Sequence, residues 1–303
     1  MNPSLLLNGH IDVVPAGEEE FNPQITEDCL VGRGAGDMKG HVVSMILALK
    51  EFVELNKDKN IALLLTSDEE VGGKNGTRHV LELGLRPQRV FIPDAMVNFD
   101  IVRSQKAPHH FHVRAKGKGG HSSRAFELDN PFNKIWDLYR EMRKKYAVAT
   151  PENDWASTFE LTVMEAEDMA ANKIPDQASA WFSWRWPLEH FSFEEGVEDF
   201  QRLCEQYGLE ILDDQHGFGE GFLIDEESNF IKLWQDIASK LTNKPIGFKN
   251  EHSASDARHF HAYDIPVLIT SAEAGNFHTE GEWINIQSLV LFTQAIYQLL
   301  NSI

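Results

Sequence analysis

Residues 61–73 read IALLLTSDEEVGG, an apolar run that ends in three acidic residues, a valine and two glycines. A short apolar run bounded by polar residues and glycine predicts a buried β-strand. Glu69 and Glu70 are adjacent carboxylates at its end, and they repel each other unless a cation or a proton compensates them. We interpret one as a metal ligand and the other as a proton-handling group; the alternative is a solvated acidic loop.

Two further apolar runs have the same form. Residues 4–12 (SLLLNGHID) end at His10 and Asp12, and residues 89–94 (RVFIPD) end at Asp94. Segments with helical spacing alternate with these runs, which predicts a sheet with parallel strands and covering helices. Such sheets bind ligands at the carboxyl ends of their strands. The sequence therefore predicts one site that contains His10, Glu69, Glu70 and Asp94.

The character of the chain changes near Gln105, where alternating strands and two amphipathic helices fit an α+β layer domain inserted into the first domain. The helix–strand alternation resumes near residue 216. We therefore predict an α/β fold with a discontinuous metal-binding domain, residues 1–105 and 216–303, and an inserted domain, residues 106–215. The expected helices are residues 37–55, 131–146, 193–207, 226–241 and 285–302, and the expected later strands are 157–164, 177–186 and 266–270.

Composition limits the classes of partner. The 303 residues carry 28 Lys and Arg against 47 Asp and Glu, a net charge of −19, which argues against nucleic acid or an anionic membrane as partner. The two cysteines, Cys29 and Cys204, lie far apart and do not indicate a disulfide framework. The sequence has no long apolar stretch of a membrane span and does not start like a signal peptide, so we expect a cytoplasmic protein.

Two further residues are candidate ligands. Asp37 lies in GRGAGDMKG, where glycines allow close backbone approach; the alternative for this residue is a helix N-cap. His278 lies in NFHTEGEW, near the C-terminus. Histidines and carboxylates gathered at strand ends match the mixed nitrogen and oxygen ligation of paired zinc ions.

Seven motifs occur in order along the chain: NGHIDVVP, GRGAGDMKG, TSDEEVGG, GKGGHSS, NKIPDQASAWFSWRW, SDARHF and NFHTEGEW. Together they resemble the co-catalytic zinc metallopeptidase family of acetylornithine deacetylase, succinyl-diaminopimelate desuccinylase, aminoacylase, carboxypeptidase G and related dipeptidases. The resemblance runs from residue 4 to the C-terminus. It implies a zinc-exopeptidase-like domain with a central mixed sheet, and an inserted ferredoxin-like domain that serves as lid and in dimerisation.

The resemblance implies two zinc ions per chain, which cobalt or manganese could replace. By their motif positions, His10 and Asp94 would hold one ion and Glu70 and His278 the other. Asp37 would bridge both ions.

The same resemblance implies catalytic and substrate-binding roles. Glu69 would be the general base, Asp12 would orient the neighbouring histidine ligand, and His121 would stabilise the oxyanion, in this family often from the partner subunit. Arg258 and Asn172 resemble residues that hold the substrate's carboxylate or backbone. The alternatives are a structural ion pair for Arg258 and a loop hydrogen bond for Asn172.

Three functions remain open at this point. A deacylase of N-acyl amino acids is favoured by the GHSSR and NKIPDQAS stretches, and a dipeptidase or aminopeptidase is favoured by Asp94. The third is an inactive, metal-binding remnant, because relatives usually carry some dozens of residues before the first motif and only nine precede His10 here. We therefore expect an exposed strand edge and exposed apolar surface. The expected partners are a small acyl-amino acid or short peptide, and a second copy of the chain bound through residues 106–215.

Overall fold

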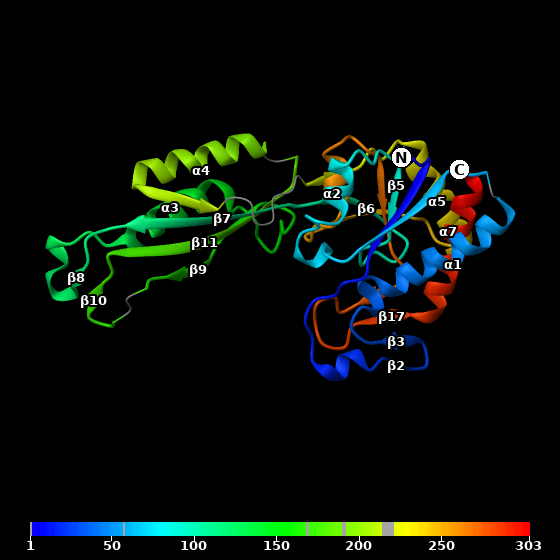
Figure 1. Ribbon diagram of the computed structural model, residues 1–303, viewed down its shortest axis with the longest axis horizontal. Helices are drawn as coiled ribbons and strands as arrows, with labels where there is room; N and C mark the ends of the chain where they lie inside the picture. The colour runs from blue at the N-terminus through cyan, green and yellow to red at the C-terminus, as the bar shows by residue number, and fades with distance from the viewer. Residues whose placement is uncertain (1, 57, 168–169, 190–191, 214–220) are drawn as a thin grey trace. The chain divides into compact units, whose positions relative to one another are not determined.

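The computed structural model describes residues 2–56, 58–167, 170–189, 192–213 and 221–303 (Figure 1). The chain divides into two compact units, one made of Met1–Gln105 with Phe222–Ile303 and the other of Lys106–Gly221. The predicted return to the first domain at residue 216 lies outside the described residues.

A four-stranded parallel sheet with strand order β15-β5-β1-β4 forms the centre of the first unit. Every residue of β1 is buried, which explains its apolar composition, because helices cover both faces of the sheet. Leu5 and Leu7 belong to the core on one face, and Leu6 belongs to the core on the other. The strands are β1 (Leu5–His10), β4 (Ile61–Thr66), β5 (Val90–Ile92) and β15 (Val267–Ile269).

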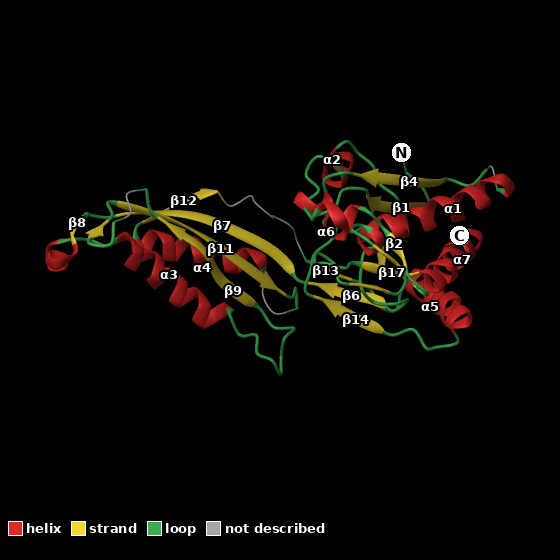
Figure 2. Ribbon diagram, turned by 90° about the horizontal axis from the view of Figure 1, so that it is seen from below, coloured by secondary structure: helices red, strands yellow, loops and turns green. Residues whose placement is uncertain are grey.

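The helices of the first unit form two groups. α1 and α5 both pack against α7 on one face of the sheet, and α2 packs against α6 in the other core (Figure 2). Ser228 and Asn285 begin α5 and α7 as N-caps, since each side chain accepts a backbone hydrogen bond from the first turn. The helices are α1 (Gly40–Leu55), α2 (Thr77–Glu82), α5 (Asn229–Thr242), α6 (Ala257–His261) and α7 (Ile286–Ser302).

The first unit contains two smaller sheets besides the central one. In the first, β14 runs parallel to β6 and places Glu251 opposite Gln105; its strands are β6 (Ile101–Gln105), β13 (Phe222–Leu223) and β14 (Phe248–Glu251). The second consists of β2 (Gln24–Ile25), β3 (Cys29–Val31), β16 (Ala274–Gly275) and β17 (Trp283–Asn285). Three short helical turns complete this unit: η1 (Glu18–Phe21), η2 (Ala35–Lys39) and η3 (Glu69–Val71).

The second unit has the order β-α-β-β-α-β around an antiparallel sheet of order β12-β7-β11-β9. Alternate residues of β11 are buried under α3 and α4, which lie on one face of this sheet (Figure 2). A two-stranded tip of β8 and β10 extends from it. The elements are β7 (Ala107–Lys116), β8 (Gly120–His121), η4 (Ser122–Glu127), α3 (Pro131–Tyr146), β9 (Thr158–Glu165), β10 (Lys173–Ile174), β11 (Gln177–Trp186), α4 (Phe193–Tyr207) and β12 (Leu209–Asp213).

The predicted α/β fold class is confirmed, and the role of residues 106–215 as lid and dimerisation domain stays a prediction. The outer strands of the central sheet are β4 and β15, and α1 exposes Val43, Ile46 and Leu47. The expectation that a shorter N-terminal region leaves a strand edge and apolar surface exposed stays a prediction. None of the described helices combines the length and the apolar character that crossing a membrane requires.

Candidate metal centre

The candidate metal centre lies at the carboxyl ends of three neighbouring strands of the central sheet. His10 is the last residue of β1, Glu69 and Glu70 form the turn η3 after β4, and Asp94 follows β5 by two residues. The strands pair in parallel, so their carboxyl ends share one edge of the sheet. This shared edge brings together side chains that are up to 84 residues apart in the sequence.

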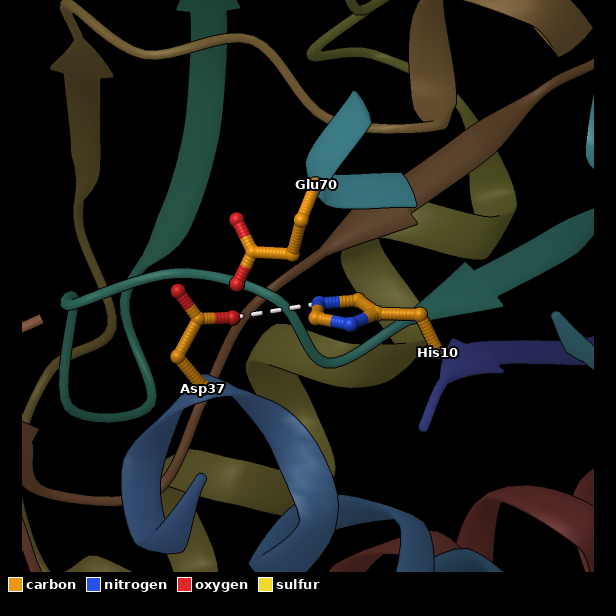
Figure 3. A group of neighbouring side chains, drawn as sticks. All are labelled: His10, Asp37 and Glu70. Carbon is orange, nitrogen blue, oxygen red and sulfur yellow. Dashed lines mark hydrogen bonds and ion pairs between the residues drawn. The ribbon is translucent and has the colours of Figure 1, made fainter. Parts of the chain in front are cut away.

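His10 is held on both sides of its imidazole ring. Its Nε2 atom lies 3.1 Å from Asp37 Oδ1 (Figure 3), and its Nδ1 atom lies 3.1 Å from the carbonyl oxygen of Asp12 and 3.5 Å from the Asp12 carboxylate. Asp12 also accepts a hydrogen bond from the backbone nitrogen of Glu70 at 3.1 Å. Asp12 therefore fixes both the histidine and the turn that carries Glu70, an arrangement common around metal-binding histidines.

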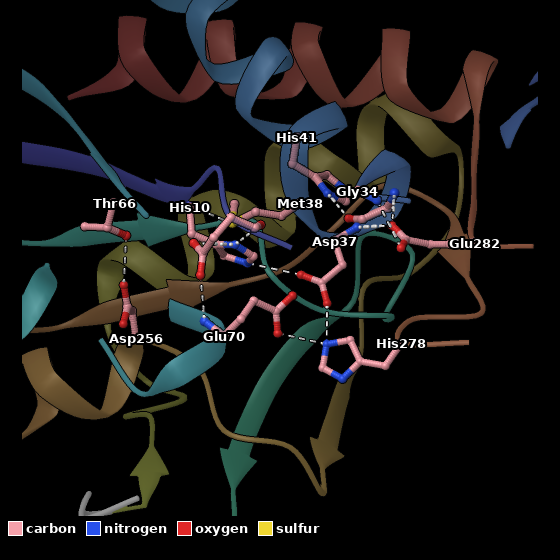
Figure 4. Close-up of polar contacts among 12 residues, drawn as sticks. His10, Gly34, Asp37, Met38, His41, Thr66, Glu70, Asp256, His278 and Glu282 are labelled. Atoms are coloured by element: carbon pink, nitrogen blue, oxygen red, sulfur yellow. Dashed lines mark hydrogen bonds and ion pairs between the residues drawn. The ribbon is translucent and has the colours of Figure 1, made fainter. Parts of the chain in front are cut away.

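Asp37 connects two histidines through its two different oxygens. Oδ1 faces His10, and Oδ2 lies 3.0 Å from His278 Nε2, which in turn lies 3.1 Å from Glu70 Oε2 (Figure 4). His278 has a left-handed backbone with φ of 60°, a conformation that residues other than glycine adopt rarely. The structure therefore places His10, Asp37, Glu70 and His278 in one continuous set of contacts.

A buried glutamate that no local sequence pattern marks supports the loop of Asp37. Glu282 is fully buried, and its Oε1 accepts hydrogen bonds from the backbone nitrogens of Gly36 at 2.9 Å and Asp37 at 2.8 Å (Figure 4). Its Oε2 accepts from the backbone nitrogen of Gly34 at 3.1 Å and from Arg33 Nη1 at 2.7 Å. One carboxylate thus takes four donors of the segment that presents Asp37, whose following peptide bond is cis.

His41 supports the same segment from the core side. Its Nε2 accepts a hydrogen bond from the backbone nitrogen of Ala272 at 3.0 Å, so its Nδ1 donates to the carbonyl oxygen of Gly36 at 2.9 Å. Burial lowers the pKa of His41 to about 4, and the ring is therefore neutral. It is a packing histidine, not a ligand.

The carboxylates of the centre carry more negative charge than the surrounding protein compensates. Burial raises the pKa of Asp94 well above its usual value, and the charge of Asp37 adds to this effect. Burial and the charge of Asp256 raise the pKa of Glu69 to about 8, against the opposing charges of His10 and Arg258. Such groups are stabilised in their charged form by a nearby cation.

At His10 and Asp37, hydrogen bonds and neighbouring charges outweigh the effect of burial on the pKa. Burial lowers the pKa of His10, but the hydrogen bond with Asp37 and the charges of Asp94 and Glu69 outweigh it and raise the pKa to about 11. Burial likewise raises the pKa of Asp37, but its hydrogen bonds with the two histidines dominate and hold it well below its usual range. The acidic groups around His10 thus favour positive charge at this place.

The donor set fits divalent metal ions. The ligand atoms of His10, Asp37 and Glu70 lie within 4.8 Å of one another, and so do those of His10, Glu69 and Asp94. Two groups that meet at a shared histidine, with nitrogen and carboxylate oxygen as the donors, suit zinc and chemically similar ions. Glu69 is thus close enough to the first strand end to act either as a ligand or as a base.

The remaining predicted site residues lie in different places. Arg258 is in α6 and is buried, and its charge opposes the rise that burial causes in the pKa of Glu69. His121 and Asn172 lie together at the tip of the second unit, where β8 pairs with β10. Both are exposed; the backbone nitrogen of Ser122 donates to the carbonyl oxygen of Asn172 at 2.9 Å. This contact involves the backbone of Asn172, and the role of its side chain stays a prediction.

The fold and the side chains gathered at the edge of its sheet define a class, the metal-dependent hydrolases that act on amide or peptide bonds. The chain belongs to peptidase family M20/M25/M40, whose sequence pattern matches residues 6–302.

Similar proteins come from several bacteria. A succinyl-diaminopimelate desuccinylase of Rickettsia bellii is 25% identical over 324 residues, which covers 98% of this chain and 81% of that protein. A tripeptidase from Staphylococcus aureus superimposes with a TM-score of 0.79 at 18% identity, covering all of this chain and 82% of the other. A dinuclear metal-binding peptidase of the M20 family from Bacillus subtilis has a TM-score of 0.70 at 16% identity, covering all of this chain and 82% of the other. The two structures show the shared fold.

Proposed function

We propose that the protein is a two-zinc hydrolase that removes the acyl group from N-acyl amino acids. The observation that carries this proposal is the geometry of Asp37, whose two oxygens contact two different histidines at 3.1 and 3.0 Å. A carboxylate in this position can bridge two ions, one on the side of His10 and Asp94 and one on the side of Glu70 and His278. When bound, a pair of zinc ions supplies a water of lowered pKa and polarises the amide carbonyl.

Glu69 is the proposed general base. Its loss of contact with water raises the pKa of its carboxyl to about 8, with the charge of Asp256 as the next cause. A base whose pKa lies near the working pH can accept a proton from water and return it to the leaving amine. Asp12 would keep His10 in one tautomer, because it lies on the Nδ1 side of the ring.

The substrate-binding residues are proposed from their motifs. The guanidinium group of Arg258 is suited to bidentate contact with a substrate carboxylate. Its buried Nε atom makes no hydrogen bond within the described part of the chain. His121 is proposed to donate to the oxyanion, and Asn172 to contact the substrate. For these two residues the support is their shared position at the tip formed by β8 and β10.

A dipeptidase or aminopeptidase is the second candidate. Asp94, in place of a glutamate at this ligand position, favours it. Both candidates use the same metal centre, and they differ in whether the group that is removed carries a free amine. An inactive, metal-binding remnant is the third reading.

A single comparison of substrates separates the three. The zinc-loaded protein is assayed against N-acetyl and N-succinyl amino acids and against dipeptides of the same residues, with protein stripped of metal as the blank. Faster hydrolysis of the N-acyl amino acids than of the dipeptides supports the deacylase. Faster cleavage of the dipeptides favours the peptidase hypothesis instead. Zinc binding without hydrolysis of any compound favours the hypothesis of an inactive, metal-binding remnant.

A further inference from the structure

Glu251 is a half-buried acidic residue beside the metal centre that the proposed mechanism does not use. It ends β14 and lies opposite Gln105, which ends the parallel strand β6. Both side chains line a cavity of about 190 Å³ that is also lined by Asp37, Glu70 and Asp94. An acidic group at this place faces the same cavity as the proposed metal ligands.

Both side chains are held in place by backbone and side-chain donors. Glu251 Oε1 accepts a hydrogen bond from the backbone nitrogen of Met96 at 2.9 Å. Gln105 Oε1 accepts from the backbone nitrogen of Ser255 at 3.2 Å and from its hydroxyl at 2.9 Å. The oxygen end of the Gln105 amide is therefore engaged, and its amino end is the group available to Glu251 and to a ligand.

Among the described residues Glu251 forms no ion pair within 4 Å, and the charge of Lys249 acts on its carboxylate from beyond that distance. Lys249, on the same strand, pairs with Asp100 at 3.4 Å. Burial raises the pKa of the Glu251 carboxyl and the charge of Asp37 adds to this, whereas the Met96 backbone, Gln105 and the charge of Lys249 lower it by less. Glu251 also belongs to neither group of potential metal ligands. A half-buried carboxylate without an ion-pair partner is stabilised by a cation that arrives with a ligand.

We propose that Glu251, positioned beside Gln105, binds a positively charged amino group of the substrate. The apolar side chains of Met96 and Phe277 line the same cavity and would exclude water from the contact. An ammonium that donates to a carboxylate forms one of the stronger hydrogen bonds in proteins. The inference rests on the proposed function and narrows its substrates to amides that carry an amine, either the α-amine of a dipeptide or the side-chain amine of an N-acyl diamino acid.

Two pairs of compounds test this proposal, and in each pair only one member carries the amine. One pair tests the α-amine of a dipeptide, and the other tests the side-chain amine of an N-acyl diamino acid. Alanyl-leucine is compared with propionyl-leucine, and N-acetylornithine with N-acetylnorvaline, in the wild type, in Glu251→Gln and in the control Glu54→Gln. Glu54 is an exposed glutamate of α1, so the control makes the same change of charge away from the cavity. Glu251→Gln keeps one oxygen for the Met96 backbone, removes the charge and replaces the second acceptor oxygen with an amino group.

Glu251→Gln should lower kcat/KM for the amine-bearing member of at least one pair by about tenfold or more, and change its neutral partner by less than about twofold. Binding of the same compounds is measured by calorimetry in the Glu69→Gln background, and zinc content is measured by elemental analysis. An equal effect on both members of each pair, or loss of zinc from Glu251→Gln, overturns the proposal. If no compound is hydrolysed, but the amine-bearing compounds bind more tightly than their neutral partners and Glu251→Gln abolishes this difference, the proposed function fails and this inference stands.

Discussion

Replacing Glu282 with glutamine removes the anion around which the loop of Asp37 is arranged. The oxygen of the new amide can still accept from the backbone nitrogens of Gly36 and Asp37. Its NH₂ group then faces two other donors, the backbone nitrogen of Gly34 and Arg33 Nη1, which now donate to Glu282 Oε2. Two hydrogen bonds are lost, one of them part of a fully buried ion pair.

The expected loss of stability follows from what remains around Arg33. Removal of one partner from a buried ion pair costs about 3–5 kcal/mol. Arg33 keeps Glu20 at 3.3 Å and the carbonyl oxygen of Thr279 at 2.9 Å, so we expect the lower end, about 3 kcal/mol. Since each kcal/mol lowers the Tm of a domain of this size by about 2–4 °C, Glu282→Gln should lower the Tm of the metal-free protein by about 6–12 °C.

The same substitution should weaken zinc binding. Groups that orient metal ligands typically contribute about 10-fold to 100-fold in affinity, and Glu282 holds the backbone of the proposed bridging residue, Asp37. Calorimetric unfolding of the metal-free protein and a zinc titration against a competing chelator measure the two effects separately. The control is Glu280→Gln, which makes the same change at an exposed position two residues away. If both variants melt and bind zinc like the wild type, Glu282 does not support the site.

Three further predictions concern the proposed function itself. The zinc-loaded protein should contain about two zinc ions per chain, and His10→Ala and Glu70→Ala should each contain less by elemental analysis; unchanged contents would remove both residues from the centre. Glu69→Gln should retain its fold and most of its zinc yet lose at least ~10²-fold in kcat, because the amide cannot accept the proton; full activity would exclude Glu69 as the base. Light scattering should show a homodimer that forms through residues 106–215, whereas a monomer at every practical concentration argues against that surface.

Local patterns in the sequence were sufficient for most of the elements. The apolar run of residues 61–66 became β4, and the helices expected at 131–146 and 285–302 are Pro131–Tyr146 and Ile286–Ser302. These segments carry their signal in contiguous residues, since burial repeats with the period of the element that contains them. The position of His10 and of the two glutamates at strand ends followed from the same patterns.

To predict which residues meet in the metal centre, local patterns had to be combined with a rule about parallel sheets and with the family resemblance. Parallel strands share a carboxyl edge, which was enough to bring together His10, Glu70 and Asp94. Asp37 precedes a helix, and His278 follows a loop. No periodic pattern marks a ligand at either position, so both were predicted from motifs. The structure places Asp37 3.1 Å from His10 and His278 3.1 Å from Glu70, with 3.0 Å between Asp37 and His278.

Only the tertiary structure distinguished Glu282 from Glu280. Both occur in the motif NFHTEGEW, and nothing in the local sequence separates them. Glu280 is exposed, whereas pairing of β17 with β3 buries Glu282 against a segment 245 residues earlier in the chain. Glu251 was equally unmarked until β14 paired with β6 and placed it beside Gln105. The partners of a buried charge depend on the path of the whole chain, and that path is decided by packing between distant segments.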